Sequence, residues 1–325
     1  MTSAAISVAG LRKSYGKVVA LDGVSFEVTE GSVLGLLGPN GSGKTTAVSI
    51  LSTALRPDAG KAKVCGFDVG TQGAAVRRVI GFAGQFAAVD ANLTGRENLA
   101  LIGRLSRLPR RTAPDRASEL LAGFGLTPAA DRLVRTYSGG MRRRLDVAAA
   151  LVHQPPVLFL DEPTTGLDPE SRFALWEAVR QLVGAGTTVL LTTQYLEEAD
   201  ALAGRIVILD SGRVVEVGTP AGLKARTGAV VFRLGFADQA GAAQAEQVLF
   251  ADGFRPERDG SAVRVSSADG SGALVGVLRA LEGRVADPVS VGVHEPTLDD
   301  VFLALTGQPL TPGDKQPADT RLGAA

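Results

Sequence analysis

The sequence predicts an α/β fold that is followed by a smaller α+β domain. Apolar, strand-sized runs alternate with helical stretches in the middle of the chain, which is typical of a sheet buried on both faces. A glycine-rich loop joins an apolar strand to a helix nearer the N-terminus. Beyond Gly228 the pattern changes to short strands and short helices, which indicates a second domain.

Length and charge limit the function classes. A chain of 325 residues can bury a sizeable core and can form two domains. The 34 basic and 34 acidic side chains cancel, so the overall charge does not indicate a nucleic-acid surface. The single cysteine, Cys65, cannot form an intrachain disulfide, and we interpret it as a small core residue.

No part of the sequence approaches the roughly 18 consecutive apolar residues that a membrane-spanning helix needs. The first five residues, Met1–Ala5, lack the basic and apolar stretches of a secretory signal. We therefore expect any membrane association to come through a partner.

The N-terminal half begins with β-rich segments and continues with helices. Three strands are predicted first, at Ile6–Leu11, Val18–Val28 and Ser32–Leu37, and a helix at Thr46–Leu55. A helical insertion is predicted over about residues 90–151, with breaks at Pro109, Pro114, Gly125 and Pro128. The sheet pattern then resumes at Val157–Leu160, Pro169–Val183 (helix), Thr187–Thr192 and Arg205–Leu209.

We assign residues 1–227 to the first domain and residues 228–307 to the second. The second domain shows strands near Val230–Phe236, Phe254–Glu257, Ala262–Ser266 and Val289–Val293, with helices at Ala242–Ala251 and Ala273–Leu281. The order β-α-β-β-α-β suggests a ferredoxin-like domain. Residues 308–325 are rich in Pro, Gly and Thr, which predicts a disordered tail.

The glycine-rich loop carries the first chemical motif. It reads Gly38-Pro39-Asn40-Gly41-Ser42-Gly43-Lys44-Thr45, followed by Thr46, and fits the phosphate-loop pattern G-x-x-x-x-G-K-[ST]. Glycines let backbone N–H groups surround phosphate oxygens, Lys44 reaches the β- and γ-phosphates, and the Thr45 hydroxyl binds Mg²⁺. The sequence therefore predicts that ATP and Mg²⁺ bind here.

A pair of carboxylates, Asp161 and Glu162, ends the apolar run Val157–Leu160. An aspartate at such a strand end can hold Mg²⁺, and the next carboxylate can polarise an attacking water. Taken alone, the pair reads more simply as an acidic turn, but the upstream phosphate loop favours the metal role for Asp161 and the catalytic role for Glu162.

The segment Tyr137-Ser138-Gly139-Gly140-Met141 precedes a predicted helix, Arg142–Leu151, and resembles the signature of ABC ATPases. In that family Ser138, Gly139 and Gly140 would present donors to the γ-phosphate of an ATP held by a second subunit. The resemblance implies a core with an antiparallel β subdomain and a helical subdomain.

Other positions match ABC elements in order. Tyr15 matches the aromatic that stacks on adenine, Gln85 the glutamine that joins the metal site to the helical subdomain, and Asp168 the loop that crosses the dimer interface. The switch histidine of the family is replaced here by Gln194. An amide can donate to a phosphate oxygen but cannot become an imidazolium, so we expect Gln194 to act as a neutral donor.

Three segments resemble the ATP-binding subunits of daunorubicin and doxorubicin exporters. They are Gly84–Asp90, Leu191–Asp200 and Glu295–Gly307. This resemblance implies that two copies form a head-to-tail dimer around two ATP molecules. It also implies a separate integral membrane permease that docks near Asn92–Leu133. The chain would then have a peripheral position on the cytoplasmic side of the cell membrane. An apolar helix face at Leu298, Val301, Phe302 and Leu305 is expected to pack on its own chain in preference to a second copy.

Alternatives remain open at this point. A soluble ABC ATPase that acts on ribosomes or nucleic acid is one, an ABC subunit that moves lipid or another substrate is a second, and an ATP-binding module without turnover is a third. The absence of sustained heptads and of a basic excess argues against the first, and the presence of Lys44, Asp161 and Glu162 against the third. The sequence does not identify the transported molecule.

Overall fold

The computed structural model describes residues 4–84, 88–227, 230–267, 271–294 and 297–306. Contacts divide the chain into a first unit that ends at Pro220 and a second unit that begins at Ala221. The boundary that we predicted after residue 227 lies slightly further along the chain. None of the described helices combines the length and the apolar composition that crossing a bilayer requires.

The first unit begins with an antiparallel sheet in the order β2-β1-β4-β5. Its strands are β1 (Ala4–Tyr15), β2 (Val18–Thr29), β4 (Ala59–Val64) and β5 (Phe67–Asp68). Buried and exposed residues alternate along the second half of β2, as expected for a strand with one face on the core. This sheet is the antiparallel β subdomain that the resemblance implied.

A second sheet of six strands, in the order β10-β9-β3-β8-β7-β6, forms the centre of the first unit. Strands β3 (Val33–Leu37), β6 (Ile80–Ala83), β7 (Val157–Asp161), β8 (Thr188–Thr193) and β9 (Arg205–Asp210) are parallel, and β10 (Arg213–Gly218) is an antiparallel edge. Every residue of β3, β7 and β8 is buried. The predicted α/β core with a mixed sheet is therefore confirmed.

Four helices of the first unit adjoin the parallel strands. They are α1 (Lys44–Leu51), α2 (Gly73–Val79), α6 (Pro169–Gly184) and α7 (Leu196–Leu202). Of these, α6 and α7 connect β7 to β8 and β8 to β9, α1 follows β3 and α2 precedes β6. Because β3, β7 and β8 run in the same direction, their carboxyl ends lie at one edge of the sheet. Function at this edge can draw on residues that are far apart in the sequence.

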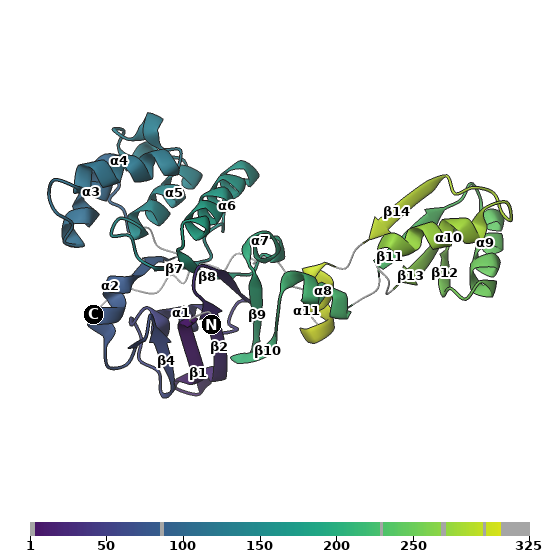
Figure 1. Ribbon diagram of the computed structural model, residues 1–325, viewed down its shortest axis with the longest axis horizontal. Coiled ribbons are helices and arrows are strands. Elements are labelled where there is room, and N and C mark those ends of the chain that lie inside the picture. The colour runs from purple at the N-terminus through teal and green to yellow at the C-terminus, as the bar shows by residue number, and fades with distance from the viewer. Residues whose placement is uncertain (1–3, 85–87, 228–229, 268–270, 295–296, 307–325) are drawn as a thin grey trace, which may run out of the picture. The chain divides into compact units, whose positions relative to one another are not determined.

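The helical insertion contains α3 (Gly95–Leu105), α4 (Ala113–Gly123) and α5 (Gly139–Ala150), with short 3₁₀ turns at Thr127–Ala129 and Val134–Thr136. In Figure 1 these three helices gather at one end of the first unit. A capping box starts α3, because Thr94 accepts from the Glu97 N–H and Glu97 accepts from the Thr94 N–H. Pro114, which we expected to break a helix, instead lies in the first turn of α4, where its missing N–H is harmless.

The second unit contains α8 (Pro220–Thr227), β11 (Val230–Gly235), α9 (Gln239–Ala251), β12 (Pro256–Asp259), β13 (Ala262–Ser267), a 3₁₀ turn at Ser271–Ala273, α10 (Leu274–Leu281), β14 (Ser290–His294) and α11 (Leu298–Thr306). The antiparallel sheet has the order β12-β13-β11-β14. Phe232 and Leu234 pack with Leu249 of α9 and Val277 of α10, so these helices cover one face. In α11, Leu298, Val301 and Phe302 are buried within the chain, whereas Leu305 is 38% exposed.

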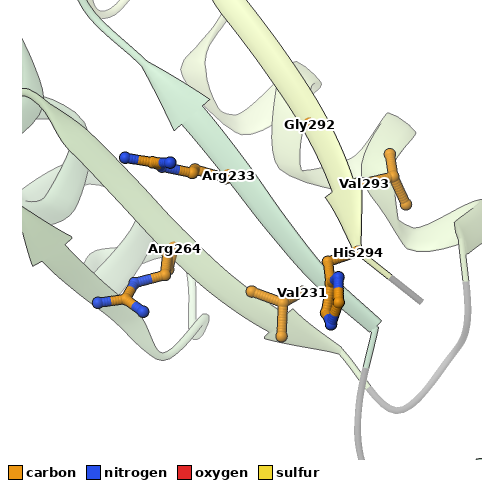
Figure 2. A pocket seen from close by; sticks show the side chains of 6 residues that line it. All are labelled: Val231, Arg233, Arg264, Gly292, Val293 and His294. Carbon is orange, nitrogen blue, oxygen red and sulfur yellow. The ribbon is translucent and has the colours of Figure 1, made fainter. Parts of the chain in front are cut away.

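The other face of this sheet is hollowed by about 470 Å³ around Gly292 (Figure 2). Arg233 and Arg264, which are direct cross-strand neighbours, project from it. Both guanidinium groups share the Asp259 carboxylate, at 4.0 and 3.6 Å respectively. The acidic neighbour offsets the repulsion that two like charges would otherwise have across a sheet.

Candidate active site

The phosphate loop lies between the end of β3 and the start of α1. Gly41 and Gly43 have φ values of 81° and 104°, in the left-handed region that glycine adopts readily. A Cβ added at Gly38 would lie 2.2 Å from the Leu209 carbonyl oxygen, and one at Gly43 would lie 2.4 Å from the Ala20 carbonyl oxygen. Close contacts therefore require glycine at positions 38 and 43, and the backbone angle favours it at position 41.

Lys44 is buried at the first position of α1, with its ammonium group turned back toward the loop. Its Nζ donates to the carbonyl oxygens of Gly38 at 2.7 Å and Pro39 at 2.9 Å, and lies 3.9 Å from Glu162 Oε1. Burial lowers the pKa of Lys44, while the neighbouring Glu162 and Asp161 charges act in the opposite direction. The loop thus holds a cation beside its own backbone, where an anionic phosphate would fit.

Asp161, the last residue of β7, meets Thr45 of α1 and Thr192 of β8. Its Oδ1 accepts hydrogen bonds from the Thr45 hydroxyl at 3.3 Å and from the Thr192 hydroxyl. A hydroxyl and a carboxylate side by side are the oxygen ligands that Mg²⁺ prefers. Among the described residues no group of three or more His, Cys, Asp and Glu side chains could hold a metal by itself. These donors fit a Mg²⁺ that takes its remaining ligands from nucleotide and water.

Glu162 is fixed by its backbone. It has a φ of 47°, which is unusual for a residue with a side chain. Its N–H donates to the carbonyl oxygen of Thr192 at 3.0 Å and to the Thr192 hydroxyl at 3.1 Å. The Thr165 hydroxyl donates to Glu162 Oε2 at 3.4 Å. The carboxylate therefore stands next to Lys44 and Asp161, where it can accept a proton from a water.

The signature segment begins the helix α5. Ser138 is the N-cap of this helix, and its hydroxyl accepts from the Met141 N–H at 3.2 Å. A Cβ added at Gly140 would lie 2.0 Å from the Ser171 hydroxyl and 3.9 Å from Asp168 Oδ2. The start of α5 therefore lies directly against the segment that contains Asp168.

Asp168 is the N-cap of α6. Its two carboxylate oxygens accept from the Ser171 N–H and the Ser171 hydroxyl, both at 2.9 Å. These bonds lower the pKa of Asp168 and keep it charged. The structure thus brings Asp168 together with Gly140 on one surface, outside the cluster of Lys44 and Glu162.

Three further predicted residues are placed as follows. Tyr15 ends β1, is 51% exposed as a residue, and has Lys13 Nζ 5.9 Å from the centre of its ring. Gln194 directly follows β8, so it stands one strand away from Asp161. Gln85 lies outside the described residues, and its predicted role stays a prediction.

Our reading of the sequence missed several buried polar groups beside the site. Arg143 and Asp146 of α5 form a pair at 3.3 Å, and Glu198 of α7, which is 0% exposed, accepts from the Trp176 indole N–H at 3.3 Å. Arg143 stands in a run of three arginines, which reads as a solvated surface, and Glu198 stands in an acidic stretch. No periodic signal distinguishes them from exposed charges.

The family model described as ABC transporter matches residues 21–165. A daunorubicin resistance ATP-binding protein of Streptomyces coeruleorubidus is 53% identical over 94% of this chain and 97% of its own length. A daunorubicin/doxorubicin resistance ATP-binding protein of Streptomyces peucetius is 50% identical over 94% and 93%. A Nod factor export ATP-binding protein of Ralstonia nicotianae is 40% identical over 93% and 94%.

Solved structures resemble the first part of the chain. An ATP-binding subunit of an ABC transporter is 28% identical with a TM-score of 0.62, over 68% of this chain and 92% of its own. A dimeric ATP-binding cassette in a post-hydrolysis state, bound to ADP and Pi, is 26% identical with a TM-score of 0.61, over 66% and 98%.

Proposed function

The chain belongs to the ABC transporter family of ATP-binding proteins, and from this premise we propose that it hydrolyses ATP to power export of a drug-like or antibiotic-like molecule through a separate membrane subunit. The observation that carries the proposal is the meeting of Lys44, Thr45, Asp161 and Glu162 at one edge of the parallel sheet. The export direction is supported by the relatives, whose names describe drug resistance and Nod factor export.

Each side chain at this edge has a proposed role. The phosphate loop and Lys44 bind the β- and γ-phosphates, since the buried ammonium group can exchange carbonyl oxygens for phosphate oxygens. Thr45 and Asp161 hold Mg²⁺, which when bound neutralises charge on the phosphates. Glu162 orients the attacking water and accepts its proton. Gln194 donates to a γ-phosphate oxygen through its neutral amide.

Two copies of the chain are proposed to close head to tail over two ATP molecules. Ser138 and the N-terminus of α5 would then donate to the γ-phosphate bound by the other copy. Asp168, which lies on the same surface as Gly140, would face the other copy's phosphate loop. A solved dimer of a related cassette supports this arrangement.

The docking site for the membrane subunit is proposed at a basic hollow of about 620 Å³ beside the helical insertion. Arg77 and Arg78 of α2, Arg107 after α3 and His153 line it, and Leu105, 75% exposed, stands at its border. Its described lining contains no carboxylate. We therefore infer that an acidic cytoplasmic segment of the permease binds here and keeps the chain on the cytoplasmic side of the cell membrane. Reversing charge with Arg77→Glu and Arg107→Glu should abolish co-purification with the permease while ATP binding stays normal.

The test of the export function is accumulation of daunorubicin in cells that express the chain with its membrane subunit. Wild type should lower accumulation, and Lys44→Ala and Glu162→Gln should both lose this effect. Lys44→Ala should fail to bind ATP, whereas Glu162→Gln should bind ATP without hydrolysing it. Glu177→Gln, a variant of an exposed carboxylate on α6, serves as the matched control and should behave as wild type.

Three outcomes would contradict parts of the proposal. ATP hydrolysis without any effect on daunorubicin accumulation would refute export of daunorubicin and leave the ATPase standing. Undiminished hydrolysis by Glu162→Gln would refute the role given to this carboxylate. Co-purification with ribosomes or nucleic acid in place of a membrane protein would favour the soluble class of ABC ATPase.

A further inference from the structure

Arg143 lies on the second turn of α5, the helix whose N-terminus carries Ser138. Its side chain is only 12% exposed and points away from solvent into the junction between the helical insertion and the parallel sheet. An arginine this buried must have its donors satisfied by nearby acceptors.

The guanidinium group of Arg143 bonds to the main chain on both sides of Glu162. Its Nη2 donates to the Asp161 carbonyl oxygen at 3.1 Å, and its Nε donates to the Pro163 carbonyl oxygen at 2.8 Å. Since the Glu162 N–H is bonded to Thr192, the peptide units around this residue are held from two directions.

The remaining donors reach Gly84 and Asp146. Arg143 Nη1 donates to the Gly84 carbonyl oxygen and to Asp146 Oδ2, the latter at 3.3 Å. Asp146 Oδ1 in turn accepts from the Ala88 N–H at 2.6 Å. The Arg143–Asp146 pair therefore bonds to the backbone at Gly84, just before Gln85, and at Ala88, further along the same connection.

We propose that the Arg143–Asp146 pair is a positioning unit that couples α5 to Glu162, so that hydrolysis becomes efficient only when α5 is correctly placed. This inference rests on the proposed function. When Ser138 at the start of α5 binds the ATP of the other copy, the rigid helix carries Arg143 with it. Through the carbonyls of Asp161 and Pro163, Arg143 then sets the direction of the Glu162 side chain.

The geometry requires arginine rather than any cation. Four acceptors surround the group in different directions, and only a planar fork with five N–H donors can serve them together. A lysine has a single point of charge with three donors and cannot span these carbonyls. We therefore expect Arg143→Lys to fail almost as completely as Arg143→Ala.

Arg144, the next residue of α5, provides a matched control. It is also partly buried, but its Nη1 donates to the Phe124 carbonyl oxygen at 2.9 Å, within the helical insertion. Arg144→Ala thus removes an equivalent side chain from the same helix without touching the main chain beside Glu162. A merely structural role for Arg143 would give both variants the same phenotype.

The experiment measures ATP hydrolysis by the full chain with its membrane subunit, as kcat and KM, and ATP affinity with a fluorescent nucleotide. Arg143→Lys and Arg143→Ala should lower kcat about 10²-fold, the effect expected when a reacting group is displaced by roughly 1 Å. ATP affinity and KM should change less than about threefold, because Lys44 and the phosphate loop remain in place. Asp146→Asn, which keeps an acceptor for Ala88, should give an intermediate kcat.

Several results would overturn the inference. If Arg143→Lys kept wild-type kcat, the fork would not be needed. If Arg144→Ala lost as much kcat as Arg143→Ala at equal thermal stability, the role would be structural only. If Arg143→Ala failed to fold, Arg143→Lys and Asp146→Asn would decide the question by the same split of kcat from KM. Absence of hydrolysis in wild type would instead refute the proposed function, which keeps the two failures distinct.

Discussion

Glu198 offers a direct test of the electrostatics beside the site. This carboxyl group is 0% exposed and accepts from the Trp176 indole N–H at 3.3 Å. Burial raises the pKa of Glu198, and bonds from Thr193, Thr164 and Trp176 oppose that rise only in part. The folded chain therefore binds a proton at Glu198 more tightly than the unfolded chain, whose glutamate has a pKa near 4.5.

The sign of the pH dependence follows from this difference. Below pH 4.5 the carboxyl is protonated in both states and contributes its full stability. As pH rises above this value, unfolding releases a proton, and the free energy of unfolding falls until the pH passes the folded-state pKa. A tenfold difference between the acid dissociation constants of the folded and unfolded states changes the free energy of unfolding by about 1.4 kcal/mol. Glu198→Gln keeps the acceptor for Trp176 and cannot ionise. The free energy of unfolding of this variant should therefore not decrease with pH in this way.

Measured at pH 5 and at pH 8, the stability of Glu198→Gln relative to wild type should be greater at the higher pH, by about 1.4 kcal/mol for each pH unit over which the glutamate is ionised only in the unfolded chain. Trp176 is the single tryptophan of the chain, so its fluorescence during urea unfolding reports on the first unit. Comparing the two proteins at both pH values removes any constant effect of the amide. Parallel stability curves for the two proteins across this range would refute a raised pKa at Glu198.

Substitutions at three other positions test separate parts of the structure. Tyr15→Ala should weaken ATP binding by about 1–3 kcal/mol if the exposed ring stacks on adenine, whereas Tyr15→Phe should bind ATP normally. Equal ATP affinity for wild type and both variants in a titration would exclude stacking. Gln194→Ala should lower kcat, and Gln194→His should restore activity with a new pH dependence near the histidine pKa of about 6.5. If the activity of Gln194→His did not vary with pH, this would argue against contact between residue 194 and phosphate. Phe232→Ala should destabilise the second unit by about 3–5 kcal/mol. Calorimetry should then show one unfolding transition at a lower temperature while the transition of the first unit is unchanged. A common shift of all transitions would show that the two units unfold together.

The sequence predicted those elements whose signal is local and strong. Strands β7, β8 and β9 were expected at the positions where they occur, because a strand buried on both faces is a continuous apolar run. Strand β4 was not anticipated, since only Ala62 and Val64 of its six residues are buried and its glycine and lysines do not indicate a strand. The edge strand β10 has no fully buried residue and the short helix α2 has only Val76, so neither shows the continuous apolar pattern that predicts an element, and both were missed.

The candidate site shows the same limit. The phosphate loop, Asp161 and Glu162 could be assigned because each motif is contiguous in the chain. Thr192 and Arg143 could not, because they act through hydrogen bonds to segments that only the folded sheet brings near them. A single sequence carries no sign that the second arginine of three faces inward.

The left-handed backbone at Glu162 has an evolutionary consequence. A φ of 47° is costly for any residue with a Cβ and nearly free for glycine. Glu162→Gly would relax the backbone, but it would also remove the proton acceptor and leave the buried Lys44 ammonium without its carboxylate neighbour. Glycine also loses more conformational freedom on folding than glutamate does. The relief of backbone strain is therefore offset, so selection for stability alone gains little by replacing the catalytic carboxylate with glycine.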